Sequence, residues 1–290
     1  GDKDGNWTEN KFDPSGKSTG SVEHKVGPDG TYKETEKNAE GKVTRDVNGD
    51  KNGKNTNTYD KDGKQISAVR ENNDGSAVGW NKNADGTQTN FEQKDKDHRE
   101  ETITKDGSVI GSRKISKDEN GQNTDTFDKD GKQTSAIREN KDGSSVGWNK
   151  NPDGTQTNFE QKDKDHREET ITKDGQVIGS QSIVKDANGV NTNTFDKDGK
   201  QSSGLRQNND GSSTGWKKNP DGSTTTTDIN AQGIASENVF DDKGNMLSSA
   251  ERNTKTGEYS QKNYKDGKVT LKTHTKDAQG VFVDETRELS

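Results

Sequence analysis

Short segments that mix threonine with valine, isoleucine, phenylalanine or tyrosine alternate along the chain with polar segments that contain glycine. Near the centre these glycines are Gly131, Gly143 and Gly154, so the turns follow one another at nearly regular intervals. The stretches between turns are about seven residues long and rich in β-branched and aromatic residues, which is typical of short strands. Helix signals are absent. The pattern predicts one strand after another, joined by tight turns.

The polar segments carry hairpin-turn sequences, such as Asn-Pro-Asp-Gly at 151–154 and Asp-Lys-Asp-Gly at 60–63. Proline favours the second position of a type I turn, and the glycine then takes the left-handed conformation of a G1 bulge. Two turns lack glycine, Lys-Asp-Lys-Asp at 94–97 and at 162–165. The glycines predicted to form structural turns in the repeats are Gly63, Gly75, Gly86, Gly131, Gly143, Gly154, Gly199, Gly211 and Gly222.

Because the loop type fixes the register of a hairpin, the facing residues of neighbouring strands can be predicted. The expected pairs are Trp80–Asn90, Gly79–Phe91, Ala68–Trp80, Val69–Gly79, Thr58–Ile66, Tyr59–Gln65 and, in the next copy, Phe159–Gly147. Side chains alternate between the two faces of a strand. One face is then expected to carry Thr56, Thr58, Ile66, Ala68, Val78 and Trp80, and the other Tyr59, Val69, Ala77 and Phe91.

Neither predicted face is purely apolar, which argues against a β-sandwich, whose strands show one apolar face. The sequence therefore predicts an all-β repeat protein. It would be a long antiparallel β-meander of about 25 short strands that forms a single-layer sheet or a spiral, superhelical ribbon. Strands about 4.8 Å apart would extend such a ribbon over about 120 Å.

A repeat of constant period underlies the pattern. The stretch from Gly86 to Gly107 recurs unchanged from Gly154 to Gly175, and longer segments begin at Asn55, Asn123 and Asn191, at a constant spacing (123 − 55 = 191 − 123 = 68). Constant periods indicate an array of stacked modules. The predicted organisation is divergent hairpins over 1–54, repeat units over 55–122, 123–190 and, degenerate, 191–258, and final hairpin strands over 259–290.

Composition limits the core and the partners. Hydrophobic residues make up 19% of the chain, far below the roughly 45–50% apolar share of globular proteins. Basic and acidic residues number 45 and 52, so the net charge is only −7, and we expect an ordered chain without a thick core. The absence of a basic block argues against nucleic-acid binding. No apolar run approaches the length that spans a bilayer, so membrane insertion is not expected.

Candidate metal ligands occur in the aspartate-rich turns. Calcium prefers hard oxygen ligands, but an EF-hand loop would need a third acid and a later bidentate glutamate, which these turns lack. We therefore expect turn formation and no cofactor, with calcium as the alternative. The aspartates concerned are Asp60, Asp62, Asp128, Asp130, Asp196 and Asp198. His98 and His166 occupy the same repeat position and are expected at the surface.

No nucleophile elbow, phosphate loop or zinc spacing is present, so no catalytic residue is predicted and the protein is not expected to be an enzyme. Thr-x-Thr pairs at 56/58 and 87/89 resemble ice-binding ladders, but the predicted register places them on opposite faces. Strand propensity explains them better. The remaining ligand candidates are Trp80, Trp148 and Trp216, which either stack against sugar rings or pack on Ala68, Ala136 and Gly204.

The stretches TYDKDGKQISAVRENNDGSAVGW and VFDDKGNMLSSAERNTKTGEY resemble the YD-repeat (RHS) family. The matching positions are Tyr59-Asp60-Gly63, Phe127-Asp128-Gly131, Phe195-Asp196-Gly199 and Phe240-Asp241-Gly244. The resemblance implies an extracellular or toxin-associated β-shell. The chain departs from the family because Lys-Gln mostly follows the glycine and little apolar interior is available. MORN-type hairpin repeats are a comparable resemblance.

The array without site chemistry favours a non-enzymatic structural segment of an extracellular or cell-surface fibre, stalk or adhesin. Its expected partners are other protein chains or further repeats of the same protein. One alternative is a scaffold fragment of a secreted YD-repeat-type toxin. A second is a glycan-binding module that uses the three repeated tryptophans.

Overall fold

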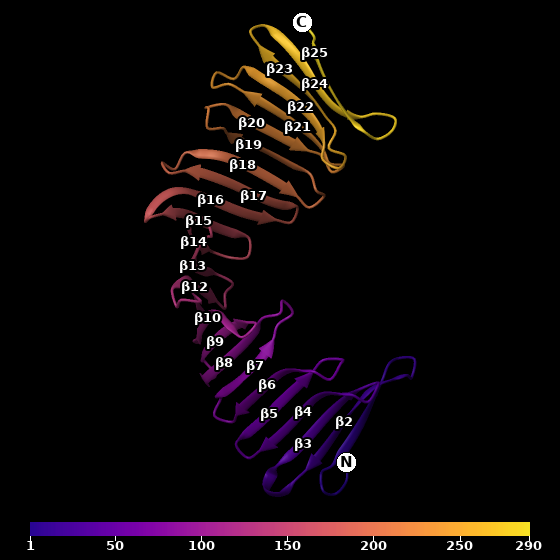
Figure 1. The fold of residues 1–290 in the computed structure, drawn as a ribbon. Coiled ribbons are helices and arrows are strands. Elements are labelled where there is room, and N and C mark those ends of the chain that lie inside the picture. Colours follow the sequence, from indigo (N-terminus) through magenta and orange to yellow (C-terminus); the bar gives the residue numbers. More distant parts are fainter. The chain divides into compact units, whose positions relative to one another are not determined.

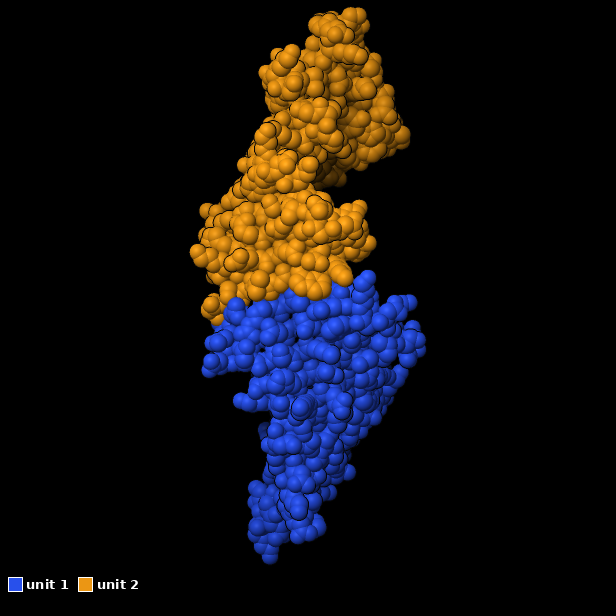
Figure 2. All heavy atoms as spheres, turned by 90° about the vertical axis from the view of Figure 1, so that its left-hand side faces the viewer, with its two compact units in different colours: residues 1–141 blue, residues 142–290 orange.

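The computed structural model describes all 290 residues, and they form 25 strands and one short 3-10 turn at Pro28–Gly30. They divide into two compact units, residues 1–141 and 142–290 (Figure 2). The strands of the first unit are β1 (Trp7–Phe12), β2 (Ser18–Val26), β3 (Tyr32–Asn38), β4 (Val43–Asp50), β5 (Gly53–Tyr59), β6 (Gln65–Asn72), β7 (Ala77–Lys82), β8 (Gln88–Asp95), β9 (His98–Lys105), β10 (Ser108–Lys117), β11 (Gly121–Asp128) and β12 (Gln133–Asn140).

The strands of the second unit are β13 (Ser145–Lys150), β14 (Gln156–Gln161), β15 (His166–Lys173), β16 (Gln176–Asp186), β17 (Gly189–Asp196), β18 (Gln201–Asn208), β19 (Ser213–Lys218), β20 (Thr224–Ile229), β21 (Ile234–Phe240), β22 (Met246–Asn253), β23 (Tyr259–Lys265), β24 (Lys268–Lys276) and β25 (Phe282–Glu288).

Within each unit every strand pairs antiparallel with the strand before it and the strand after it in the chain (Figure 1). All extensive contacts between strands join such neighbours, so no second layer covers either face of the sheet. The all-β, antiparallel meander predicted from the sequence is thereby confirmed.

Two backbone hydrogen bonds close each typical turn. At 60–64 the N–H of Asp60 donates to the carbonyl of Lys64 at 2.9 Å, and the N–H of Gly63 donates back to the carbonyl of Asp60 at 3.0 Å. Gly63 can donate this second hydrogen bond because its φ is +83°, in the left-handed region that residues with a Cβ rarely adopt. At the nine turn glycines named above, φ lies between +78° and +88°.

Turn geometry sets the register, as predicted. The pairs Trp80–Asn90, Gly79–Phe91, Ala68–Trp80, Val69–Gly79, Tyr59–Gln65 and Phe159–Gly147 are confirmed. We call the face that carries Ala68, Trp80 and Asn90 the tryptophan face, and the face that carries Val69 and Phe91 the phenylalanine face. The equivalent tryptophan and phenylalanine side chains define the same two faces in the second unit.

The predicted pair Thr58–Ile66 is wrong. Thr58 lies opposite Ser67, and Ile66 is the additional residue of a β-bulge next to the turn. The bulge shifts the rest of β5 by one position, so Thr56 and Thr58 share the phenylalanine face with Val69. Tyr59 lies on the tryptophan face instead of the phenylalanine face. Its hydroxyl donates to Asp46 at 2.7 Å on the tryptophan face, so the faces predicted for these residues are wrong.

The same correction removes the argument that the threonine pairs lie on opposite faces. Thr89 is two residues from Phe91 on the same strand, so it shares the face of Thr56 and Thr58. Thr87 and Thr89 are nevertheless buried, and both hydroxyls accept hydrogen bonds from the Asn83 amide, at 2.8 and 3.0 Å. These two hydroxyls are engaged inside the hairpin, which leaves them unsuited to an ice-binding surface.

Little apolar surface is removed from water. Only Val22, Val47, Phe91, Phe159 and Ala235 are buried apolar side chains, and no side chain is less than 2% exposed. Val78 and Val146 occupy equivalent places and are each 50% exposed. Most strand residues are half-buried on one side of a single layer. The sheet therefore depends on ladder hydrogen bonds, cross-strand pairs and turns more than on a core.

Replacement of Gly154 by valine should lower the thermal midpoint of the full chain more than Val146→Ala. A Cβ at Gly154 would meet no atom within 4 Å, so the cost is conformational: roughly 1–2 kcal/mol for a left-handed residue, and more for a β-branched one. Val146→Ala removes a side chain that is 50% exposed and should cost about 0.5 kcal/mol.

Gly154→Asn is the matched control, because asparagine tolerates the left-handed region better than valine. Thermal melts of the three variants give the comparison. A larger loss for Val146→Ala than for Gly154→Val would mean that a true apolar core stabilises the hairpin.

Candidate functional site

The aspartates proposed as calcium ligands divide into two roles. The carboxylate of Asp60 accepts the backbone N–H groups of Lys64 and Asp62, both at 2.9 Å, and these bonds, that from Lys64 first, lower the pKa of Asp60. The Asp128 and Asp196 carboxylates accept the equivalent pairs. The outer aspartates Asp62, Asp130 and Asp198 are exposed and accept no hydrogen bond. No three histidine, cysteine, aspartate or glutamate side chains lie together in a way that could hold a metal ion.

An ion pair that sequence reasoning missed links alternate turns. Arg138 on β12 reaches past β11 to Asp118 in the preceding turn, with Nη1–Oδ2 and Nη2–Oδ1 distances both 2.8 Å. The same two-point contact joins Arg70 to Asp50 and Arg206 to Asp186. We call this contact the turn clamp. Its only signal in the sequence is that the aspartate and the arginine both recur with the period of the repeat.

Each clamped aspartate also holds its own turn. Asp118 accepts the backbone N–H of Asn120 at 2.8 Å and of Gly121 at 2.9 Å, so its carboxylate is surrounded by donors. The Arg138 guanidinium, followed by these backbone donors, holds the pKa of Asp118 far below its usual range. A backbone bond from Lys141 to the carbonyl of Asn120, at 2.8 Å, joins the two turns directly. The edge of the sheet is thus cross-linked from turn to turn.

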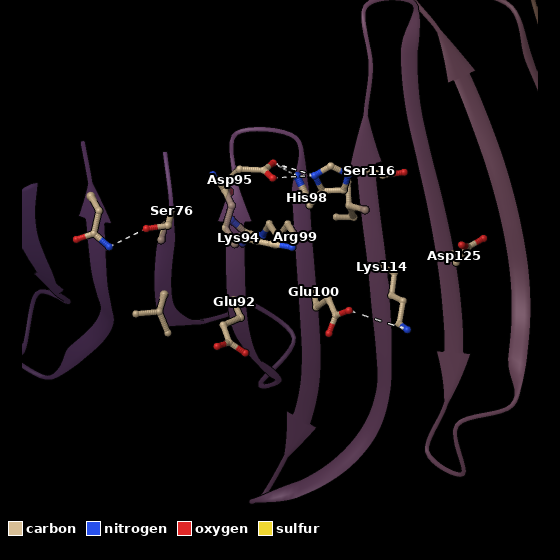
Figure 3. Close-up of a pocket in the computed structure, with 15 residues that line it drawn as sticks. Ser76, Glu92, Lys94, Asp95, His98, Arg99, Glu100, Lys114, Ser116 and Asp125 are labelled. Carbon is tan, nitrogen blue, oxygen red and sulfur yellow. Dashed lines mark hydrogen bonds and ion pairs between the residues drawn. The ribbon is translucent and has the colours of Figure 1, made fainter. Parts of the chain in front are cut away.

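A groove of about 880 Å³ lies in the first unit over β6 to β11 (Figure 3). Charged side chains of the tryptophan face line it. Glu92 and Glu100 stand directly opposite each other on β8 and β9, and Lys114 Nζ lies 4.0 Å from the Glu100 carboxylate. Two like charges at opposed positions destabilise a sheet, although solvent screening at this exposed site limits the effect.

The second unit repeats part of this groove. A smaller hollow of about 360 Å³ is lined by Glu160, Lys162, Asp163, His166 and Glu168, each one repeat period after its counterpart in the first unit. The position of Lys114 is taken by Ser182, whose hydroxyl donates to Glu168 at 2.7 Å. The two grooves therefore share their acidic lining, and they differ in the group that contacts the second glutamate, a lysine ammonium in the first groove and a serine hydroxyl in the second.

The first groove also brings together Asp95, His98 and Ser116, which are residue types found in catalytic triads (Figure 3). His98 Nδ1 lies 2.9 Å from Asp95, and Ser116 is the cross-strand partner of His98. No hydrogen bond joins His98 to Ser116, and the second copy keeps the histidine–aspartate pair but has Val184 in place of the serine. In both copies the aspartate accepts turn N–H groups, so a turn-stabilising role explains the shared pair.

On the phenylalanine face an arginine covers each buried phenylalanine. The Arg99 guanidinium lies 3.7 Å from the centre of the Phe91 ring, and its Nε donates to Glu101 at 2.8 Å. Arg113 Nη2 approaches the other oxygen of this buried carboxylate at 2.6 Å. In the second copy Arg167, Phe159 and Glu169 repeat the arrangement. These contacts replace the second layer that the sheet lacks.

The three repeated tryptophans are all half-buried on the tryptophan face. Trp80 stands opposite Ala68, and Trp216 stands opposite Gly204. Lys150 Nζ lies 6.0 Å from the Trp148 ring centre, whereas no cation lies over Trp80 or Trp216. A groove of about 540 Å³ surrounds Trp216. Trp216 thus differs from Trp148 in having no cation over its ring, and it lines a groove.

The structure contains no helix with the length and apolar character needed to cross a membrane.

No protein-family model and no curated protein matches the chain. Among solved structures, the fold is similar to a chain of the Tc holotoxin pore of Photorhabdus luminescens, in a mutant form, at 10% identity and a TM-score of 0.18. The similarity covers 96% of this chain and 17% of the length of that chain. A superposition this loose carries no argument about function, so the YD-repeat resemblance rests on the turn sequences.

Removal of the turn clamps should reduce the sensitivity of the fold to acid. Because the pKa values of Asp50, Asp118 and Asp186 are lowered in the folded chain, their contribution to stability is present above about pH 4, the unfolded pKa of aspartate. It is lost as the pH falls below that value, because the folded state then binds fewer protons than the unfolded state. The triple variant D50N/D118N/D186N should show a smaller drop of the thermal midpoint between pH 5 and pH 2.

The matched control is D62N/D130N/D198N, which removes the same number of charges from exposed turn positions. The control should keep the acid sensitivity of the parent chain. Equal slopes of midpoint against pH for the two triple variants would show that the clamps do not stabilise the folded state.

Proposed function

We propose that the chain is a non-enzymatic structural segment of an extracellular or cell-surface fibre, stalk or adhesin. One observation carries the proposal: within each unit, every strand packs only on its neighbours in the chain. In such an array stability is a sum over adjacent modules, and hairpins can be added or removed without rebuilding a core. A segment of this kind suits a spacer.

The surface chemistry supports this role. Charged residues make up 33% of the chain, and many of them pair with one another, as in the turn clamp and the Arg99–Glu101–Arg113 cluster. Dense charge on both faces discourages the stacking of exposed sheets, which a single layer must avoid in order to remain soluble. The partners proposed on this basis are neighbouring repeats and other protein chains.

The alternative, a scaffold fragment of a secreted YD-repeat-type toxin, predicts different neighbouring sequence. A toxin domain encoded after Ser290 in the full-length gene would favour the scaffold, and an anchor motif there would favour the stalk.

Deletion of residues 123–190 tests the spacer directly. This removes six strands and joins Gln122 to Asn191. In the repeat Gln122 is equivalent to Val190, and Asn123 is equivalent to Asn191, so the junction keeps the phase of the repeat. The shortened chain should still fold and melt cooperatively. Its maximum dimension in small-angle scattering should fall by up to about 29 Å, because each strand adds about 4.8 Å.

A deletion of residues 89–156 is the control, since it removes the same length at a different phase of the repeat and joins Gln88 to Thr157. It should shorten the chain equally. A compact parent particle, or loss of folding in both deletions, would contradict the spacer.

A further inference from the structure

The third copy of the repeat differs from the first two around its tryptophan. Trp216 lies on β19, with β18 on one side and β20 on the other, and a groove of about 540 Å³ opens over these strands. This volume lies within the range of small-ligand sites, roughly 300–1,000 Å³. The groove is contained within the second unit.

A glycine shapes the floor of the groove. The first two copies have Ala68 and Ala136 at the position of Gly204. A Cβ added to Gly204 would lie 2.9 Å from Trp216 Nε1, closer than such contacts occur. The indole therefore occupies space that a methyl group would fill, and it lies directly against the backbone of β18. No hydrogen bond within the chain engages its N–H.

The side chains at the rim of the groove differ from those of the earlier copies: one is more polar, and one is shorter. Val78 and Val146 of the earlier copies are replaced by Thr214, and Glu92 and Glu160 by Asp228. The Thr214 hydroxyl hydrogen-bonds to the Asp228 carboxylate on the next strand, which orients that carboxylate. Thr226 lies opposite Trp216 and adds a hydroxyl beside the ring.

The one cation in the lining is already engaged. The Arg206 guanidinium contacts Asp186 at 2.7 and 2.8 Å, and its Nε donates to Asn208 at 2.9 Å. No cation lies over the Trp216 ring, in contrast to Trp148. Arg206 is thus unavailable to an anionic ligand in the groove, which would instead meet the Asp228 carboxylate. An aromatic ring with an oriented carboxylate, hydroxyls and the amides of Asn191 and Asn193 matches an uncharged ring compound that carries several hydroxyl groups.

We propose that the groove at Trp216 is a binding site for a neutral saccharide. The C–H face of a pyranose ring stacks on the indole, and its hydroxyls pair with Asp228 and Thr226. The site is specific to the third copy, so the chain carries one such subsite rather than three. This goes beyond the spacer role, because a spacer needs no ligand.

The test uses the full chain and a panel of soluble neutral oligosaccharides, namely β-linked gluco-, galacto-, manno- and N-acetylglucosamine hexamers. The indole N–H signals of the four tryptophans are followed by ¹H–¹⁵N NMR, and affinity by titration calorimetry. At least one oligosaccharide should shift the Trp216 signal with little effect on Trp80 and Trp148. Trp216→Ala should weaken binding at least about tenfold, the loss typical of a central aromatic contact.

The repeat supplies a matched control. Trp148→Ala removes the equivalent ring from the second copy and should leave the affinity within about twofold. Gly204→Ala should weaken binding by crowding the indole, and Asp228→Ala, at an exposed position, tests the polar rim without disturbing the fold. Trp216→Phe keeps an aromatic ring in place should Trp216→Ala fail to fold.

Three outcomes would overturn the proposal. They are the absence of binding by every neutral oligosaccharide, equal losses for Trp148→Ala and Trp216→Ala, and unchanged affinity in both Trp216→Ala and Asp228→Ala. Binding that is confined to sialylated or sulfated glycans would also exclude it, since Arg206, the one cation in the lining, is held by Asp186.

Discussion

The left-handed glycine of the hairpin turn is the constraint on which the rest of this structure depends. A sheet with one layer cannot bury its side chains fully, so the pairing of strands is not set by a core. It is set in the turns. In the turn at 60–64 the N–H of Gly63 donates to the carbonyl of Asp60, and the Asp60 carboxylate accepts the N–H groups of Asp62 and Lys64. Each turn then fixes the register of two strands, and the register decides which side chains meet.

Charged side chains take over several tasks that apolar packing performs in globular domains. The turn clamp connects turns that are two strands apart, and Arg99 covers Phe91 where a second sheet would otherwise lie. Such contacts are individually modest in water, and the opposed Glu92 and Glu100 show that the sheet tolerates unfavourable pairs at exposed positions. Stability is therefore distributed along the array and is local, which is the property that a modular spacer requires.

Sequence reasoning succeeds where turn chemistry alone decides the geometry. It places Trp80 opposite Asn90 correctly because the loop at Gly86 leaves only one register. It fails at Thr58. The bulge at Ile66 follows a turn of ordinary sequence and shifts the register of β5 by one residue, so the side chains of β5 lie on the faces opposite to those predicted. The turn clamp joins residues 20 positions apart with no local pattern between them, and only the recurrence of Asp118 and Arg138 in each copy could have suggested it.

The three copies also show which positions the array holds constant and which it varies. The third copy retains its turn glycines, Gly199, Gly211 and Gly222, and its turn clamp, yet Thr227 stands where the earlier copies bury phenylalanine. The changes gather on strand surfaces that no other layer covers, where a new side chain disturbs only its immediate neighbours. Because the turns determine the fold, side chains on the faces of such a sheet can change in one copy without disturbing the others, and a binding site can arise in a single copy. The Trp216 groove, with Gly204, Thr214 and Asp228 all changed on three adjacent strands, is what such local divergence would produce.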